Sequence, residues 1–216
     1  MWPKIYFRWL LYSNRAALFD QLHRASWYST IFSEWIVNLA LPGQARAIDV
    51  GCGPGALTLA LHSHNVSAIG VDCAQNMLAY ARRHGQQLGH ENIFQIADAY
   101  ALPFGNRTFD VAMAASFINV VPNPVATLKE MVRVTKTGGQ VSFLVPDVTM
   151  NRARAKQFAK TRQLSAADAV LLNLWSGRAR KISQENAMDL AAAVNLRELR
   201  ISTYLDAMVY TVTGEV

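Results

Sequence analysis

Asp49-Val50-Gly51-Cys52-Gly53-Pro54-Gly55 is the stretch that decides the fold class of this 216-residue chain. It follows a short apolar run, Ala45–Val50, and precedes Ala56–Leu61, whose residues favour a helix. Glycine is needed where the backbone turns tightly and approaches a ligand closely, and a helix that follows presents unpaired N–H groups to that ligand. The stretch therefore predicts a strand, a glycine-rich turn and a helix, with a ligand site at the turn. A tight turn that binds nothing is the alternative.

The spacing of the glycines separates two kinds of nucleotide-binding turn. A fold that binds a nicotinamide dinucleotide also begins with a glycine-rich turn, but its pattern is G-x-G-x-x-G. Here Gly51, Gly53 and Gly55 alternate strictly, and Asp49 stands just ahead of them. This spacing disfavours a nicotinamide-dependent oxidoreductase.

Strand and helix patterns alternate along the rest of the chain. The predicted strands are Ala45–Val50, Ser67–Val71, Ile93–Ile96, Phe109–Ala114 and Gln140–Val145, with later candidates near Leu199–Thr203 and Ala207–Val212. Helices are predicted from Ala56, over about 74–88, over about 124–134 with Gly138-Gly139 as its end, and over about 184–194. Strands that alternate with helices form a parallel sheet with helices on both faces. No internal repeat or linker marks a second domain, so one domain over 1–216 is expected.

Composition and cysteine usage point to a cytoplasmic protein. Hydrophobic residues make up 51% of the chain and charged residues 17%, which is the apolar content that a packed core requires. Cys52 and Cys73 are the only cysteines and cannot build a disulfide framework. We find no secretory leader pattern, and no apolar run approaches the ~20 residues that a membrane span needs.

Further motifs follow the glycine turn in a consistent order. Val71-Asp72 ends the second predicted strand, Ala97-Asp98-Ala99 follows the third, and Phe109-Asp110-Val111 begins the fourth. Together with the turn, over about residues 45–146, they resemble the class I S-adenosylmethionine-dependent methyltransferases. The segment Val134–Gly139 departs from that family's L-K-P-G-G turn by a threonine in place of the proline. The pattern is most similar to the small-molecule branch that includes the ubiquinone and menaquinone C-methyltransferases.

This resemblance implies a fold, a cofactor and a reaction. The fold is a doubly wound, mostly parallel, seven-stranded Rossmann-like sheet whose last strand is antiparallel. The cofactor is S-adenosyl-L-methionine, and its methyl group passes to a small molecule by in-line displacement. The glycine turn would surround its methionine part, Asp72 would accept hydrogen bonds from both ribose hydroxyls, and Asp98 would lie beside the adenine amino group. The residues expected at the cofactor are Asp49, Gly51, Cys52, Gly53, Gly55, Asp72, Cys73, Met77, Asp98, Ala99, Ser116 and Phe117; no metal site is expected.

The resemblance also divides the chain. It implies an N-terminal helical cap over 1–44, a cofactor-binding core over 45–146, and substrate-side helices and the last strands over 147–216. Candidate catalytic residues are His23 and Tyr28, in the segment that caps the site in relatives, and Asn119. Many relatives have a histidine where Asn119 stands, so a backbone-capping role is the alternative there. A base is optional, because the sulfonium of the cofactor is already a reactive methyl donor.

Positive charge gathers in two segments. The chain has a formal net charge of +6, while Val148–Gln184 alone carries eight Lys or Arg against one Asp, and Met1–Ser33 carries four against one. Arg152, Lys156 and Lys160 have helical spacing, which predicts that they share one face. These charges favour an anionic or polar-headed apolar acceptor, or peripheral contact with an anionic membrane. A solvated basic helix is the alternative.

Two other functions remain open from the sequence. A nucleic-acid methyltransferase would use basic surface for phosphate contacts, but the residues after the fourth strand, Ser116-Phe117-Ile118-Asn119, do not match the Asn-Pro-Pro-Tyr-like motif of base-amine methyltransferases, and no RNA-binding module is visible. Nucleic acid is therefore not an expected partner. A non-catalytic S-adenosylmethionine-binding protein would keep the same turn. Monomer and homodimer are equally open.

Overall fold

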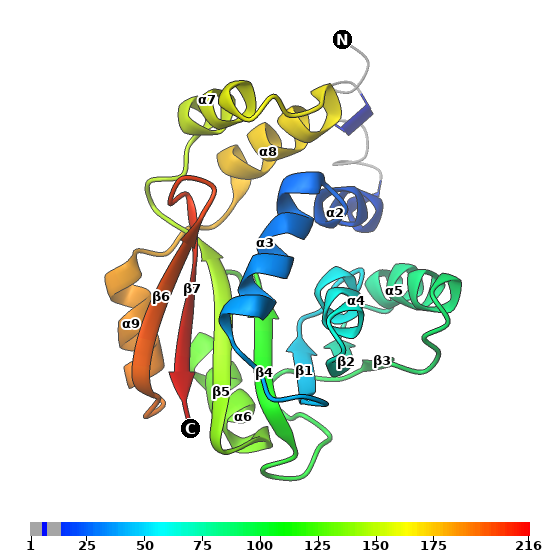
Figure 1. Cartoon of the computed structure of the whole chain (residues 1–216), viewed down its shortest axis with the longest axis vertical. Coiled ribbons are helices and arrows are strands. Elements are labelled where there is room, and N and C mark those ends of the chain that lie inside the picture. Colours follow the sequence, from blue (N-terminus) through cyan, green and yellow to red (C-terminus); the bar gives the residue numbers. More distant parts are fainter. Residues whose placement is uncertain (1–5, 8–13) are drawn as a thin grey trace.

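A seven-stranded sheet forms the centre of the computed structural model, which describes residues 6–7 and 14–216 (Figure 1). Its strands lie in the order β3-β2-β1-β4-β5-β7-β6. β7 runs antiparallel to both β5 and β6, and all other neighbours are parallel. The strands are β1 Arg46–Val50, β2 Ser67–Asp72, β3 Phe94–Ile96, β4 Phe109–Ala115, β5 Thr135–Pro146, β6 Arg197–Tyr204 and β7 Val209–Glu215. The predicted fold, with an antiparallel last strand, is confirmed.

Helices cover both faces of the sheet. α3 and α4 share one hydrophobic cluster with the strands, and α6 and α9 share another on the opposite face. The helices are α2 Arg15–His23, α3 Ser26–Asn38, α4 Ala56–Ser63, α5 Gln75–Gln87, α6 Pro124–Val134, α7 Arg152–Thr161, α8 Ala166–Arg178 and α9 Gln184–Ala192. None of these helices is long and apolar enough to cross a lipid bilayer.

The central strand β4 shows why both faces need a cover. Val111 and Met113 belong to the cluster under α3 and α4, whereas Ala112 and Ala114 belong to the cluster under α6 and α9. All four side chains are fully buried. Because successive strand residues point to opposite faces, the part of a strand that is buried on both sides is apolar at every position.

The prediction that Gly138-Gly139 ends a helix was wrong. α6 ends at Val134, and β5 already begins at Thr135, so both glycines lie inside the strand. Gly138 has a φ of +74°, and the pairing of β4 with β5 shifts register nearby. The backbone of this irregular segment pairs with the chain end, since Gly138 N donates to Val216 O and Val216 N donates to Gly139 O, both at 3.0 Å.

The predicted last strand, Ala207–Val212, was misplaced as well. Leu205, Asp206 and Ala207 have φ values of 51°, 52° and 60°. Three consecutive residues in the left-handed region reverse the chain and cannot belong to a strand. β7 therefore begins at Val209 and continues to Glu215, where it completes a hairpin with β6.

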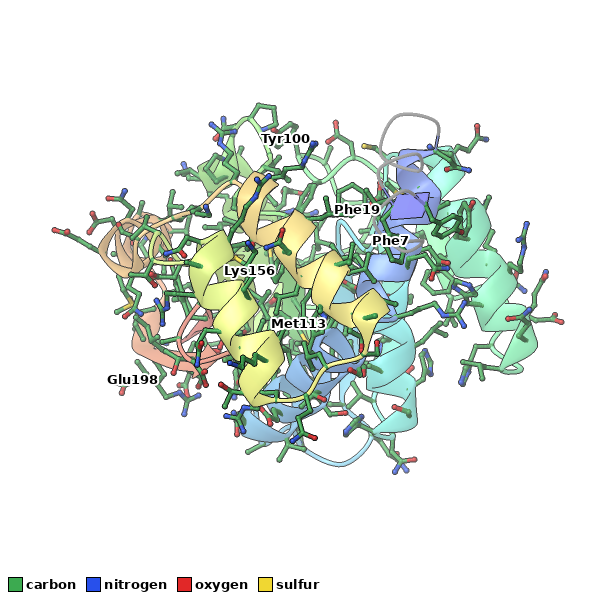
Figure 2. All side chains as sticks on the ribbon, turned by 90° about the horizontal axis from the view of Figure 1, so that it is seen from above. Phe7, Phe19, Tyr100, Met113, Lys156 and Glu198 are labelled. Atoms are coloured by element: carbon green, nitrogen blue, oxygen red, sulfur yellow. The ribbon has the colours of Figure 1, made fainter. Side chains whose placement is uncertain are left out.

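The topology determines where a ligand can bind. The strand order reverses between β1 and β4, and in open sheets of this kind ligands bind at the carboxyl ends of the strands at such a point. α2, α7 and α8 lie over that edge of the sheet in Figure 1. Figure 2 looks down on the same edge, with α7 and α8 lying across it. The N-terminal cap predicted over 1–44 can be described only from residue 14 onward and at residues 6–7.

Candidate active site

The glycine turn after β1 has a backbone that only glycine adopts easily. Gly51, Gly53 and Gly55 have φ values of 72°, 53° and 87°, all in the left-handed region. The N–H groups of Gly51 and Cys52 donate to the carbonyl of Val71, at 2.8 and 3.0 Å. The turn is therefore held against the end of β2.

The three glycines face different surroundings. A Cβ on Gly51 would collide with the ring of Phe117, and one on Gly55 would lie 2.6 Å from the ring of Phe94. Gly53 differs, because its Cβ would meet only His23 Cε1, at 3.9 Å. Gly51 and Gly55 thus allow close packing within the protein, while Gly53 faces open space.

Asp72 links the turn to the helix that follows β2. Its Oδ2 accepts a hydrogen bond from Gly53 N at 2.9 Å, and its Oδ1 accepts one from Ala74 N at 2.8 Å. Each carboxylate oxygen can accept a further bond. Asp72 both shapes the turn and retains capacity for a ligand.

Asp49 is a carboxyl group buried beneath the turn. Thr58 Oγ1 donates to its Oδ2 at 2.8 Å, and its Oδ1 has no hydrogen-bond partner among the described residues. Burial raises the pKa of Asp49 to about 7, and the nearby charge of Asp72 acts in the same direction, against the hydrogen bond from Thr58. The group therefore changes charge near neutral pH.

A cleft of about 260 Å³ lies at the carboxyl ends of the central strands, close to the ~300 Å³ at which small-molecule sites begin. Six of the residues predicted for a cofactor line it: Gly51, Asp72, Cys73, Asp98, Ala99 and Phe117. Sequence reasoning missed Val71, Ala97, Tyr100, Val120, Val121 and Pro122, which line it as well. The only feature of the sequence that could have indicated them is their position, because each lies within a few residues of a predicted cofactor residue.

Other predicted residues lie around the cleft rather than along it. Cys52 is buried and packs with Leu78, Ala81 and Phe94, and burial raises the pKa of its thiol. Gly55 packs against the same phenylalanine. Met77 lies in the first turn of α5.

An aromatic cluster adjoins the turn. The Tyr28 hydroxyl is 2.9 Å from Ser116 Oγ, and the Tyr28 ring stacks on His23 at a centroid distance of 4.9 Å. Ser116 has a φ of +52° and precedes Phe117, whose ring covers Gly51. Two of the candidate catalytic residues thus lie beside the glycine turn, although the chain separates them widely from it.

The protonation of this cluster follows from its burial. Burial lowers the pKa of His23 to about 4 and raises the pKa of Tyr28. His23 Nδ1 is buried without a hydrogen-bond partner among the described residues. At neutral pH both side chains are therefore uncharged.

A comparison with known protein families agrees with the methyltransferase resemblance of the sequence. Residues 48–143, which contain the turn, Asp72 and Phe117, match the model of a methyltransferase domain. These residues form a class I S-adenosylmethionine-dependent methyltransferase domain. The family implies S-adenosyl-L-methionine as cosubstrate.

Curated relatives of the methyltransferase domain act on different acceptors. The chain is 40% identical to the phosphatidylethanolamine N-methyltransferase of Cereibacter sphaeroides over 98 residues, 44% of this chain and 48% of that protein. It is 34% identical to the demethylmenaquinone methyltransferase of Staphylococcus saprophyticus over 139 residues, 61% of this chain and 54% of that protein. The chain spans about half the length of these relatives.

A solved structure extends the likeness in fold beyond the methyltransferase domain. An S-adenosylmethionine-dependent methyltransferase from Thermotoga maritima superposes with a TM-score of 0.64 at 22% identity, covering 97% of this chain and 94% of that one. At this identity the likeness concerns the fold alone.

Asn119 has a partner outside the methyltransferase domain. Its Nδ2 donates to the carbonyl of Arg180 at 2.7 Å, and its Oδ1 is buried without a partner among the described residues. The bond ties the loop after β4 to the segment that follows α8.

Among the described residues, no group of His, Cys, Asp or Glu could hold a metal ion.

Proposed function

We propose that this protein transfers the methyl group of S-adenosylmethionine to a small molecule. The observation that carries the proposal is the open face of Gly53 beside Asp72, in a turn whose other two glycines are closed by Phe117 and Phe94. A structural turn needs no open position, whereas a turn that receives a ligand does. Residues 1–44, 45–146 and 147–216 would serve as cap, cofactor-binding core and substrate side of one domain.

The residues around the turn fit the cofactor by their chemistry. Asp72 has acceptor capacity for two ribose hydroxyls, and Asp98, which lines the same cleft, suits an exocyclic amine. Asp49 Oδ1 is a buried acceptor without a partner among the described residues, which suits the positive charge of the methionine part. We assign Gly51–Gly55, Cys73, Met77, Ala99, Ser116 and Phe117 to the surroundings of the same ligand.

Positioning and exclusion of water are the tasks left to the protein, because the cofactor supplies a methyl group on a reactive sulfonium. His23, with a pKa of about 4, would hold a proton weakly at neutral pH, so we assign it a packing role against Tyr28. Tyr28 keeps its proton and can donate a hydrogen bond toward the acceptor. Asn119 would hold the loop after β4 against the segment that follows α8, through its hydrogen bond to the carbonyl of Arg180.

Tyr28→Phe tests this positioning role. The variant keeps the ring that stacks on His23 and removes the hydroxyl that bonds Ser116. Product formation should fall about tenfold, which corresponds to the ~1.4 kcal/mol of one hydrogen bond in the transition state, while the dissociation constant of S-adenosylhomocysteine changes little. Tyr204→Phe, which removes a hydroxyl near Asn38 instead, is the control. Equal turnover of both variants would remove Tyr28 from the mechanism.

Asp72 can be tested with two substitutions. Asp72→Ala should weaken binding of S-adenosylhomocysteine by about 1–3 kcal/mol, the range for hydrogen bonds to a charged group, and should also lower stability, because Gly53 N and Ala74 N lose their acceptor. Asp72→Asn keeps one acceptor oxygen and should retain more of the fold. Calorimetry and thermal melting separate the two effects. Exposed Asp189→Ala is the control, and an unchanged dissociation constant in both Asp72 variants would place the ribose elsewhere.

The proposed function itself is tested in two steps. S-adenosylhomocysteine should raise the melting temperature and NAD should not, because only a ligand of the native state stabilises it. Cell extracts supplied with methyl-labelled cofactor should then yield a labelled small molecule. Label in nucleic acid would favour a nucleic-acid methyltransferase. Binding without any labelled product would favour a non-catalytic S-adenosylmethionine-binding protein.

A further inference from the structure

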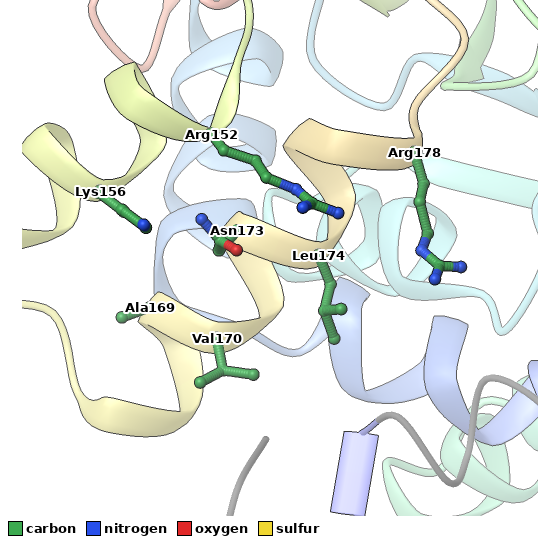
Figure 3. Close-up of a pocket in the computed structure, with 7 residues that line it drawn as sticks. All are labelled: Arg152, Lys156, Ala169, Val170, Asn173, Leu174 and Arg178. Atoms are coloured by element: carbon green, nitrogen blue, oxygen red, sulfur yellow. The ribbon is translucent and has the colours of Figure 1, made fainter. Parts of the chain in front are cut away.

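A second cavity, of about 590 Å³, lies between α7 and α8 (Figure 3). Arg152 and Lys156 line it from α7, and Asn173 and Arg178 line it from α8. Figure 3 shows the Arg152 side chain extending across α8 and the Lys156 side chain pointing toward Asn173. The apolar part of the lining is Ala169, Val170 and Leu174. One cavity therefore combines three cations with an apolar wall.

The charges in this cavity are not neutralised by the described residues. None of Arg152, Lys156 and Arg178 forms an ion pair with a described carboxylate. Asp168 is the only carboxylate on α7 or α8, and it accepts hydrogen bonds from Ser26 of α3 instead. The Asn173 Nδ2 atom is buried without an acceptor among the described residues. An amide donor and three cations with no acceptor are the groups that an oxyanion satisfies.

Gly177 leaves room for the Arg152 side chain. A Cβ at position 177 would collide with the Arg152 guanidinium, so this exposed helical glycine gives the arginine room to cross α8. The helical spacing predicted that Arg152, Lys156 and Lys160 share a face; Lys160 does not line the cavity, and Arg178 of the next helix does.

α8 connects this cavity to the candidate active site. The opposite face of α8 carries Trp175, whose ring contacts the ring of Tyr28 at a centroid distance of 5.2 Å. Just beyond Arg178, the carbonyl of Arg180 accepts the hydrogen bond from Asn119, between the cleft residues Phe117 and Val120. The basic cavity is therefore linked to the candidate active site through α8 and the segment that follows it.

We propose that the cavity between α7 and α8 binds the phosphate group of an amphiphilic methyl acceptor. The two guanidinium groups can each engage phosphate oxygens in a bidentate manner, while the Lys156 ammonium and the Asn173 amide add single donors. Val170 and Leu174 would contact the adjoining apolar chain. The acceptor part of this inference rests on the proposed methyl transfer, whereas phosphate binding does not. The phosphate can belong to a soluble phosphoester or to a membrane lipid.

The experiment uses hexyl phosphate as a soluble probe and vesicles of phosphatidylglycerol in phosphatidylcholine as a membrane probe. The test variant combines Arg152→Gln, Lys156→Gln and Arg178→Gln. The control variant combines Arg83→Gln, Lys129→Gln and Lys160→Gln, which removes the same charge at exposed positions outside the cavity. Calorimetry gives the affinity for hexyl phosphate, and sedimentation gives vesicle binding. The wild type and the control variant should bind alike, and the test variant should bind at least tenfold more weakly.

Binding of hexyl phosphate would show that the phosphate can belong to a soluble phosphoester. Binding of vesicles without binding of hexyl phosphate would show that it belongs to a membrane lipid. Either result supports the proposal if the test variant loses binding and the control variant does not. Equal losses in both variants, or no binding of either probe, would overturn it. Gly177→Ala is an independent variant, since it displaces Arg152 without removing charge, and it should weaken the same binding. Affinity for S-adenosylhomocysteine should remain unchanged throughout. The two proposals can therefore be refuted separately: phosphate binding can be observed in a protein without methyl transfer, and methyl transfer can be observed in a protein that does not bind phosphate.

Discussion

Gly53→Val is expected to abolish binding of S-adenosylhomocysteine in a protein that still folds. A Cβ at this position meets only His23 Cε1, at 3.9 Å, so a valine can be placed beside Asp72 without a clash at its Cβ. If the methionine part of the cofactor occupies that space, the side chain excludes it. Placing a β-branched residue at a φ of 53° costs about 1–2 kcal/mol, which a domain of this size can absorb. Calorimetry on the folded variant measures the loss.

Gly89→Val is the matched control for this variant. Gly89 has a φ of 76° and no heavy atom within 4 Å of a new Cβ, so the substitution has a similar backbone cost at a site away from the cleft. Its affinity for S-adenosylhomocysteine should equal that of the wild type. Gly55→Val would not serve, because its Cβ would lie 2.6 Å from the ring of Phe94 and the variant should unfold. Wild-type affinity in Gly53→Val would show that the turn holds no ligand.

Asp49→Asn is expected to remove a large pH dependence from the stability of the ligand-free protein. The folded pKa of Asp49 is about 7, above the reference value of 3.8. Between these values the folded state keeps a proton that the unfolded state has lost. The stability contributed by the neutral carboxyl is therefore fully present below pH 3.8 and is lost as the pH rises through 7. The folded pKa lies about three units above the reference value, which corresponds to about 4 kcal/mol in the free energy of unfolding.

The measurement compares the wild type with Asp49→Asn in urea at several pH values between 5 and 8. Asparagine keeps an oxygen that can accept the hydrogen bond from Thr58. His23 acts in the opposite direction, because its lowered pKa makes stability rise with pH from about 4 to 6.5. It is present in both proteins, so the difference between them isolates Asp49.

Between pH 5 and 8 the free energy of unfolding of the wild type should fall by about 3 kcal/mol relative to that of Asp49→Asn. Exposed Asp189→Asn should follow the wild-type curve. Parallel curves for the wild type and Asp49→Asn would contradict the burial of a titrating group. S-adenosylmethionine, which is cationic, should bind the wild type more tightly as the pH rises through 7, because the ionised carboxylate attracts it. Asp49→Asn should lack that increase.

Patterns within single segments of the sequence determined much of this fold. The alternating glycines and Asp49 predicted the turn, and the apolar runs predicted the parallel strands in their order. The helix predicted from about Pro124 to Val134 has those bounds, because Asn123 caps it and proline suits the first helical position. Local patterns succeed here because backbone angles, caps and burial on both faces depend on neighbouring residues.

Only the tertiary structure decided how distant segments meet. Tyr28 and Ser116 bond across 88 residues, and the cavity between α7 and α8 takes Arg178 rather than Lys160. The same holds for the start of β5, where the chain end supplies the partner for Gly138. Such contacts depend on how helices pack above the sheet, and periodicity within one helix carries no information about the neighbour that will face it. The glycine turn could therefore be predicted from the sequence, while the open face of Gly53 and the unneutralised charge of the basic cavity arise from packing between elements.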